Sequence, residues 1–380
     1  MTAIFSDLAE QAHGSVILKY GETIVLATAC MSKDSQAVLG FFNLTVDYAE
    51  KFYSACKILG SRFVRREGKP SEEAILASRV IDRTLRPLFD QSIRHAVQII
   101  VTVLSVDEND PTILAINAAS LALAVSNIPW AGPIGCVRIG KYRDEDNSDT
   151  LTINPAQSLR IEDSSLYKFD LTVCGKNGNI NMIEASARES TEDELEQAFK
   201  IASAEISKLE EFQKDIVKEI GKEKRVIEKE TISPESIKLF NENILPKMEE
   251  AIFAHAAAGQ AVAGKEKIDA LHTEWNNLAK EKLSEIFPDK KDFSLEDNLF
   301  DDTENEILHE KAIEEGRRAD GRAMDEVRSL YAQAGGLSTK LHGSGIFYRG
   351  GTHVLSALTL GGPEDRNLVD GLQIKEEQRF

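Results

Sequence analysis

The sequence is poor in cysteine and contains no long apolar run. Its four cysteines, Cys30, Cys56, Cys136 and Cys174, are scattered without the spacing of a metal site or a disulfide framework. We therefore expect reduced thiols, most of them buried. No apolar run approaches the roughly 18 residues of a membrane-spanning helix, and the N-terminus has no basic region followed by an apolar one. These absences predict a soluble, cytoplasmic protein without a membrane segment.

Positive charge is scarce as well. The 380 residues carry a formal net charge of −18, which argues against a protein that binds nucleic acid over its whole surface. The acidic excess is local, because residues 191–320 hold 33 acidic and 19 basic side chains and so account for −14 of the total. Any basic surface must therefore be a focused groove. The length and the 42% hydrophobic content predict two or three domains with large cores.

Residues 60–89 do not resemble ordinary core, and they contain clear helix signals. Ser71 is a good N-cap, and Glu72 and Glu73 follow it in the first turn, where the helix dipole favours carboxylates. Pro87 ends the element. We expect the buried face of this helix to consist of Ile75, Leu76, Val80, Ile81 and Leu85.

Three arginines of this helix lie on one flank. Arg79, Arg83 and Arg86 are spaced i, i+4 and i+7, and stacked like charges cost a few tenths of a kcal/mol per pair unless an anion binds to them. This spacing favours a polyanion site. An alternative remains open, because Asp82 lies three residues from Arg79 and four from Arg86, so intrahelical ion pairs would absorb part of the charge.

A second group of cations precedes the helix. Arg65 and Arg66 lie in a loop bounded by glycine and proline, next to Phe63. Arginine forks match phosphate oxygens in a bidentate way, and an aromatic ring offers a stacking surface to a base. Together with the helix, this loop predicts a site for single-stranded nucleic acid.

Alternating and β-branched segments fill much of the first 190 residues. A hairpin is predicted around Gly21, and an Asn-Gly step at Asn177 predicts a second one. The Ala-rich segment 112–125 predicts a helix. These elements predict one α/β domain with helices on a mixed sheet. Its expected strands are 16–20, 23–29, 41–48, 97–106, 135–142, 151–154, 167–174 and 180–187.

The sequence pattern changes from strand-like to helical after residue 190. A capping box at residues 191–194 opens a long charged helix that we expect to run to Lys222. Two or three helices are expected between residues 233 and 286, followed by a polar connector at 289–302. A solvated helical spacer describes this part better than a catalytic domain does.

Candidate metal ligands are few. His255 and His272 have no ligand partners nearby in the sequence, so surface or core histidines are expected. Asp47 and Glu50 are the closest pair of carboxylates to a metal site, but a salt bridge at the end of a strand explains them better.

A sequence segment near the N-terminus is repeated near the C-terminus. Residues 342–357 align without gaps on residues 13–28, with 8 of 16 positions identical, at an offset of 329. This is an internal duplication. The second copy reaches only Phe380, so about 40 residues represent a domain whose first copy needs about 190, and a strand set this short cannot bury its apolar face alone. We expect a truncated chain.

These motifs together resemble the bacterial polynucleotide phosphorylase (polyribonucleotide nucleotidyltransferase) family. They are, in order, LTVDYAEKFYSACKI, FVRREGKPSE, RVIDRTLRPLF, IPWAGPIG, RRADGRAMDEVRSL and HGSGIFYRGGTHVLSALTLG. The resemblance implies an α/β (α+β) ribonuclease PH-like core with a mixed sheet at residues 1–205. An all-helical domain at 206–310 and the start of a second ribonuclease PH-like core at 311–380 would follow.

The resemblance also implies roles for individual residues. The family forms a ring-shaped homotrimer with RNA threaded through its channel, and the implied RNA-binding residues are Phe63, Arg65, Arg66, Arg79, Arg83, Arg86 and Arg349. The sequence departs from the family at Val64, where a second aromatic is usual, and at Thr84, where proline is usual. The family's first strand is expected to be missing from the N-terminus.

The implied reaction is phosphorolysis of single-stranded RNA from its 3′ end. Inorganic phosphate attacks the terminal phosphodiester and releases a nucleoside diphosphate, and Mg²⁺ neutralises charge. The family's phosphate-binding serines and metal-binding aspartates are expected beyond Phe380, so no catalytic or metal-binding residue is assigned in this chain. An RNA-degradation complex is a further expected partner.

Two functions of different classes stay open. The first is the phosphorolytic enzyme, present here as an incomplete chain that releases no ADP from poly(A). The second is a non-catalytic RNA-binding or scaffolding protein that retains the first core and the helical domain. Continuation of the coding sequence past Phe380 distinguishes them. For both we expect binding to single-stranded RNA that weakens as salt rises.

Overall fold

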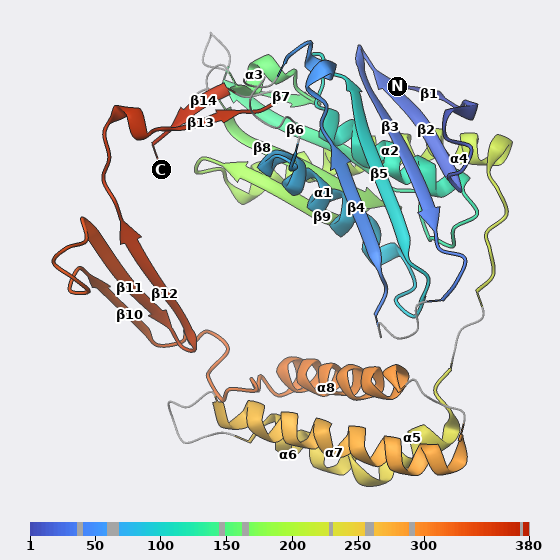
Figure 1. The fold of residues 1–380 in the computed structure, drawn as a ribbon, viewed down its shortest axis with the longest axis vertical. Helices are drawn as coiled ribbons and strands as arrows, with labels where there is room; N and C mark the ends of the chain where they lie inside the picture. Colours follow the sequence, from blue (N-terminus) through green and yellow to red (C-terminus); the bar gives the residue numbers. More distant parts are fainter. Residues whose placement is uncertain are drawn as a thin grey trace. The chain divides into compact units, whose positions relative to one another are not determined.

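The computed structural model forms two compact units (Figure 1). The first comprises residues 1–229 and 367–378, and the second comprises residues 230–366 and 379–380. The residues described are 1–35, 41–58, 68–143, 149–161, 167–227, 231–254, 262–288, 293–372 and 375–379.

Two sheets organise the first unit. Sheet A has the strand order β1-β2-β3-β5-β4, and only β4 and β5 run parallel. It contains β1 (Thr2–Ile4), β2 (Gly14–Tyr20), β3 (Thr23–Met31), β4 (Leu44–Ala49) and β5 (Val97–Ser105). Sheet B is antiparallel in the order β7-β6-β8-β9, with β6 (Gly135–Arg143), β7 (Asp149–Ile153), β8 (Tyr167–Lys176) and β9 (Asn179–Ala187). The predicted mixed sheet is confirmed.

Helix α2 (Pro111–Val125) lies between the two sheets (Figure 1). Every residue of this helix except Thr112 is buried, as expected for a helix that is apolar on all sides. It packs on β2, β3 and β5 on one side and on β6 and α4 (Glu192–Ile220) on the other. A Cβ at Gly14 would lie 2.1 Å from the Ala122 carbonyl oxygen, so glycine permits the close approach of β2 to α2.

Helix α1 (Glu72–Leu85) covers β4. Its N-cap is confirmed, because the Ser71 hydroxyl accepts a hydrogen bond from the Ala74 N–H at 3.0 Å. The predicted buried face is partly wrong. Ile75 and Leu76 are 48% and 63% exposed, and Val80 is only partly buried. The face that packs consists of Ala74, Ala77, Ile81, Thr84 and Leu85.

The small side chains of α1 explain this correction. Ala74 and Ala77 let the helix backbone approach β4 closely, and Ile81 continues the same face one turn later. Because each residue turns a helix by about 100°, Ile75 and Leu76 point away from that face. Hydrophobicity alone therefore predicts the wrong buried face for the first turn of α1.

Helix α4 opens with the predicted capping box. The Thr191 hydroxyl accepts from the Glu194 N–H, and the Glu194 carboxylate accepts from the Thr191 N–H at 2.9 Å. The helix ends at Ile220 rather than at Lys222. It continues without a break through residue 205, and α8 (Ser294–Glu314) continues through residue 310, so the two domain boundaries predicted there both fall inside helices. The short helix α3 (Gln157–Ile161) completes the α-helices of the first unit in its described part.

Four helices form a separate apolar core in the second unit. They are α5 (Pro234–Asn243), α6 (Leu245–Ile252), α7 (Val262–Ile286) and α8 (Ser294–Glu314). Trp275 is fully buried among Phe240 and Phe300, and its indole N–H donates to the Glu296 carbonyl at 2.7 Å. The polar connector predicted at 289–302 is wrong from Ser294 onward, because Glu296 and Phe300 turn inward as part of α8.

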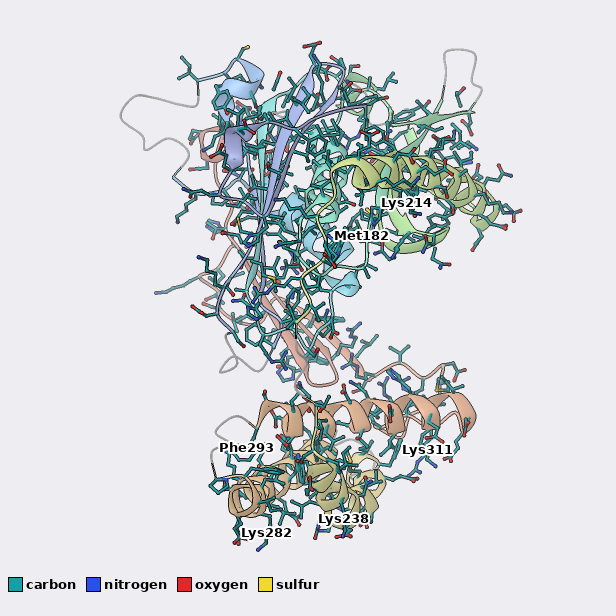
Figure 2. All side chains as sticks on the ribbon, turned by 90° about the vertical axis from the view of Figure 1, so that its right-hand side faces the viewer. Met182, Lys214, Lys238, Lys282, Phe293 and Lys311 are labelled. Carbon is teal, nitrogen blue, oxygen red and sulfur yellow. The ribbon has the colours of Figure 1, made fainter. Side chains whose placement is uncertain are left out.

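The outer faces of these helices are charged. Figure 2 labels Lys238, Lys282 and Lys311, which lie on α5, α7 and α8. Lys238 and Lys282 each lie within 4 Å of a carboxylate on their own helix, and Lys311 lies 2.7 Å from Glu315, directly after the end of α8. Surface pairs of this kind contribute little to stability. The outer faces of these helices are therefore charged and solvated.

The internal duplication is present in three dimensions. In the second unit, β10 (Leu330–Ala334), β11 (Gly343–Arg349) and β12 (Thr352–Leu358) form a three-stranded antiparallel sheet. The pairs Tyr20↔Thr23 and Arg349↔Thr352 close equivalent hairpins. His13 Nδ1 accepts from the Met31 N–H, and His342 Nδ1 accepts from the Leu360 N–H.

The match extends to the N-terminal strand, which was expected to be missing. Strand β1 pairs with β2 through Thr2↔Lys19, and β10 pairs with β11 through Tyr331↔Tyr348, at the same offset. The N-terminal strand is therefore present in the first unit, at a length of three residues.

Among the described residues, none of the helices combines the length and the apolar composition needed to span a bilayer. The last elements are the short hairpin strands β13 (Asn367–Asp370) and β14 (Lys375–Gln378), which belong to the first unit.

We predict that Leu121→Ala lowers the unfolding free energy of the first unit by about 2–5 kcal/mol, because Leu121 is fully buried in α2 and its truncation leaves a cavity. Leu76→Ala is the matched control, since Leu76 is 63% exposed and its loss changes stability by no more than about 0.5 kcal/mol. Urea titration followed by circular dichroism measures both. Equal losses would contradict the rotation of α1 and the burial of α2 described here.

Candidate nucleic-acid interface

Arg79 and Arg83 are exposed cations on α1. Arg79 has no ion pair within the described residues. The Arg83 guanidinium lies 3.6 Å from the Glu184 carboxylate of β9, and these two side chains are 60% and 50% exposed. A surface pair of this kind is weak, so both arginines are available to an anion.

Arg86 has a different environment. Its Nε and Nη2 donate to the two carboxylate oxygens of Asp82 at 2.9 and 2.6 Å. The same guanidinium donates to the carbonyl of Leu44 at 3.2 Å, and at 3.4 Å to that of Phe42. The alternative of an intrahelical ion pair is therefore confirmed for Arg86, which ties the end of α1 to the start of β4.

The other predicted RNA-binding residues lie elsewhere in the chain. Phe63, Arg65 and Arg66 lie outside the described residues. Arg349 is in the second unit, where it ends β11 with its side chain exposed. Gly350 follows it with φ of +56°, as the tight turn requires. The RNA-binding roles of these residues stay predictions.

Asp47 and Glu50 do not form the expected salt bridge within the described part of the chain. Asp47 accepts from the Gln98 amide at 3.3 Å. Glu50 accepts from the Ser71 hydroxyl at 2.6 Å. Burial raises the pKa of Glu50, and this hydrogen bond partly offsets the effect. No group of three or more His, Cys, Asp or Glu side chains in the described ranges is arranged to hold a metal ion.

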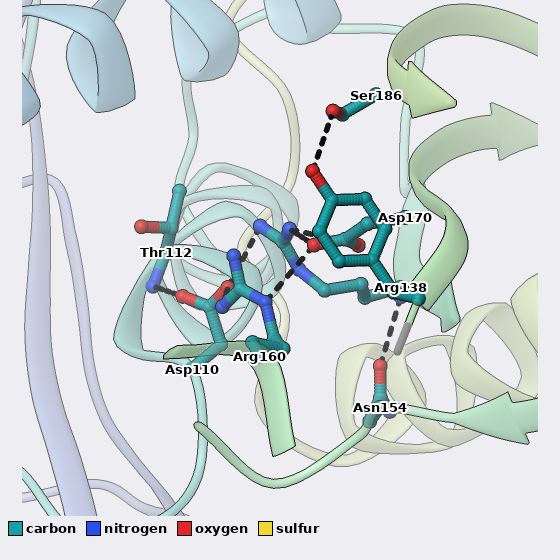
Figure 3. A network of polar contacts seen from close by, with 8 residues as sticks. Asp110, Thr112, Arg138, Asn154, Arg160, Asp170 and Ser186 are labelled. Atoms are coloured by element: carbon teal, nitrogen blue, oxygen red, sulfur yellow. Dashed lines mark hydrogen bonds and ion pairs between the residues drawn. The ribbon is translucent and has the colours of Figure 1, made fainter. Parts of the chain in front are cut away.

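A network of partly buried charges closes the N-terminus of α2 (Figure 3). Arg138 of β6 binds Asp110 at 2.8 Å and Asp170 of β8 at 2.9 Å. Arg160 of α3 binds the same two carboxylates at 3.0 Å each. Asp110 also caps α2 by accepting from the Thr112 N–H at 2.8 Å.

This network decides what the end of α2 can bind. A free helix N-terminus attracts anions, but here the Asp110 carboxylate occupies that position. Burial alone would raise the pKa of Asp110, yet the guanidinium groups of Arg138 and Arg160 hold it below its ordinary value. The carboxylate therefore stays ionised, and the exposed arginines of α1 are the better anion site in the first unit.

Comparison with known proteins identifies a family domain in the sequence. A model described as the 3′ exoribonuclease family, domain 1, matches residues 1–129. These residues include sheet A, α1 and α2. The first unit thus contains a domain of the 3′ exoribonuclease family.

Several curated relatives carry the name polyribonucleotide nucleotidyltransferase. The protein from Caldicellulosiruptor saccharolyticus is 40% identical over 97% of this chain and 50% of its own length. Those from Halothermothrix orenii and Halalkalibacterium halodurans are each 39% identical, over 98% and 100% of this chain and 51% of their own lengths. The family resemblance is thus confirmed, and the chain spans about half the length of the curated relatives it matches.

The exposed cations Arg79 and Arg83 of the first unit are predictable from the sequence, whereas its partly buried ones are not. Arg79 and Arg83 stand out because their helical spacing is local. Arg138, Arg160 and Asp170 lie on three separate elements and meet Asp110 only after sheet B folds over α2. The one local signal was Asp110 directly before Pro111, which is typical of an N-cap.

We predict that Arg86→Ala lowers the unfolding free energy of the first unit by about 1 kcal/mol, because it leaves Asp82 and the carbonyls of Phe42 and Leu44 without their donor. Arg79→Ala on α1 changes stability by less than about 0.5 kcal/mol, because Arg79 is exposed. Chemical denaturation of both variants provides the measurement. A larger loss for Arg79→Ala would overturn the distinction between the two arginines.

We predict that the first unit loses stability as the pH falls below about 4. The folded pKa of Asp110 is lowered, so its stabilising contribution is present above the unfolded pKa and disappears as the pH falls through the folded one. Asp110→Asn removes this part of the pH dependence, whereas Asp7→Asn at an exposed position retains it. Unfolding free energies measured from pH 7 to pH 3 test this, and identical slopes for all three proteins would contradict it.

Proposed function

We propose that this protein is a phosphorolytic 3′-to-5′ exoribonuclease acting on single-stranded RNA. The supporting observation is 40% identity over 97% of the chain to proteins named polyribonucleotide nucleotidyltransferase. The exposed guanidinium groups of Arg79 and Arg83 agree with a polyanionic substrate. We also propose, from the family resemblance, that the protein acts in the cytoplasm as a homotrimer and contributes to mRNA turnover with other degradation proteins.

The proposed reaction transfers a nucleotidyl group to phosphate. An oxygen of inorganic phosphate attacks the last phosphodiester, the bond to the 3′ oxygen of the preceding ribose breaks, and that oxygen takes a proton. A nucleoside diphosphate and a shortened RNA result. Because attacker and target are both anions, cationic side chains must neutralise them.

The proposed contribution of this chain is to hold the RNA backbone. Arg79 and Arg83 present their forks on one face of α1, and Arg65 and Arg66 precede that helix in the sequence. Bidentate contacts to phosphate oxygens fix position without selecting bases. RNA of any sequence is therefore the expected ligand, with stacking on Phe63 as an additional contact.

Mg²⁺ is implied by the family, but the described residues do not assemble a site for it. Asp47 and Glu50, the best pair in the sequence, bind Gln98 and Ser71 instead.

We predict that the double variant Arg65→Ala, Arg66→Ala weakens binding of a fluorescent oligo(A) by at least about tenfold and reduces the slope of log K against log salt by about 1.4. The control variant Lys200→Ala, Lys208→Ala removes the same charge from two exposed positions of α4, and its affinity stays within about twofold of the parent. Fluorescence anisotropy at several salt concentrations is the measurement. A parent chain that does not bind RNA, or a double variant that binds as tightly as the parent, would overturn the proposal.

A further inference from the structure

Four basic residues meet at the start of β2 in the first unit. His13 directly precedes β2, Lys33 follows the end of β3 by two residues, and Lys222 and Arg225 lie in the segment after α4. Burial lowers the pKa of His13, and the nearby charges of Lys222, Arg225 and Lys33 lower it further. All three of these charges are positive, so the imidazole lies in a local field that favours anions.

The three cations of this cluster lack a carboxylate partner in the described part of the chain. Lys33, Lys222 and Arg225 are exposed, and none of them forms an ion pair with a described residue. Asp34 and Glu223 are their neighbours in the sequence, but neither is among the charges that shift the pKa of the imidazole. In a chain with a net charge of −18, this is a local concentration of positive charge that an external anion can neutralise.

The end of α2 holds the segment after α4 in place. The Lys222 N–H donates to the Val125 carbonyl at 3.0 Å, and the Arg225 N–H donates to the Asn127 carbonyl at 2.8 Å. The Lys222 ammonium also donates to the His13 carbonyl at 2.8 Å. The backbone that carries two of the cations is therefore fixed before any ligand binds, which reduces the entropic cost of association.

The His13 ring adds a hydrogen-bond donor to the cluster. Its Nδ1 accepts from the Met31 N–H at 3.3 Å, so the proton of the neutral ring is on Nε2. Because its pKa is lowered, the ring is mostly neutral at pH 7. An anion bound among the cations opposes the charges that disfavour protonation, so binding raises the pKa of His13.

We propose that His13, Lys33, Lys222 and Arg225 form a phosphate-binding site. A single carboxylate offers one negative charge, whereas a nucleoside diphosphate or a run of phosphodiesters offers several to three cations. The guanidinium fork and the two ammonium groups are also suited to phosphate oxygens. The phosphate groups belong to an RNA backbone or to a free nucleoside diphosphate, which share this chemistry. The site goes beyond the proposed function, because it uses none of the residues that hold RNA there.

Histidine side-chain NMR of the full 380-residue chain tests the site, with ADP and oligo(A) as separate probes. The sequence has seven histidines, and the signal that disappears in His13→Asn identifies His13. His342 is the internal control for the ADP titration, because its Nδ1 makes the equivalent contact with the Leu360 N–H. The duplication places Gly362 where the first copy has Lys33.

We expect at least one of the two probes to move the titration midpoint of His13 to higher pH, whereas ADP leaves that of His342 unchanged. In the double variant Lys33→Gln, Arg225→Gln, the probe concentration that produces half of this change rises by at least about tenfold, because two charged contacts are lost.

The matched control is Lys200→Gln, Lys208→Gln, which removes the same charge from α4. Each of these lysines already lies 2.6 Å from a carboxylate of its own helix. The half-saturating probe concentration of this variant therefore stays within about twofold of the parent.

The two probes distinguish the source of the phosphate. A response to oligo(A) alone identifies the RNA backbone, a response to ADP alone identifies a free nucleotide, and a response to both shows that the site accepts either. A His13 midpoint that neither probe moves overturns the site, and so does an equal change in the two double variants.

The same titrations separate this proposal from the proposed function. A chain whose His13 responds to ADP but which does not bind oligo(A) supports the phosphate site and overturns the proposed function. A chain that binds oligo(A) while neither probe moves the His13 midpoint overturns the phosphate site and leaves the proposed function intact.

Discussion

The first unit depends on the burial of a helix that has no polar face. Helix α2 is buried at every position except Thr112, so it needs cover on all sides, and a single sheet covers only one. Sheet A provides one layer, and β6 with α4 provides the other. The presence of two sheets in this unit follows from that requirement.

Burial on all sides also creates a problem at the two ends of α2, where backbone groups have no partner within the helix. At the N-terminus, Asp110 accepts from the Thr112 N–H and is held by Arg138 and Arg160. At the C-terminus, the Lys224 ammonium donates to the carbonyls of Leu123, Ala124 and Ser126 at 2.8, 3.0 and 2.7 Å. Burial lowers the pKa of Lys224 to about 8, so the lysine stays mostly charged at neutral pH.

How much of the fold could be predicted depends on whether the sequence pattern that encodes a feature lies within a few neighbouring residues. The Ser71 cap, the capping box at Thr191 and the strand pattern are encoded within a few residues, and the structure confirms them. The rotation of α1 was not encoded in that way. It depends on the close approach of β4, which selects Ala74 and Ala77 over the larger Ile75 and Leu76. Helix α8 was missed for a related reason, because its acidic surface hides the buried Glu296 and Phe300.

The arginines show the same limit for the prediction of functional residues. By sequence, Arg79, Arg83 and Arg86 form one row of equivalent cations. In the structure, Arg86 binds Asp82 through two nitrogen atoms and belongs to the scaffold. Arg138 and Arg160 are likewise committed to carboxylates.

What makes an arginine available to RNA is therefore the lack of a strong internal partner rather than its place in a row. In a chain with a net charge of −18, a carboxylate that already binds a guanidinium in two places competes directly with phosphate. Only cations outside such pairs can supply the focused positive potential that a polyanion needs. By this criterion Arg79 and Arg83 qualify on α1, since the first has no ion pair in the described structure and the second has only a solvent-exposed one.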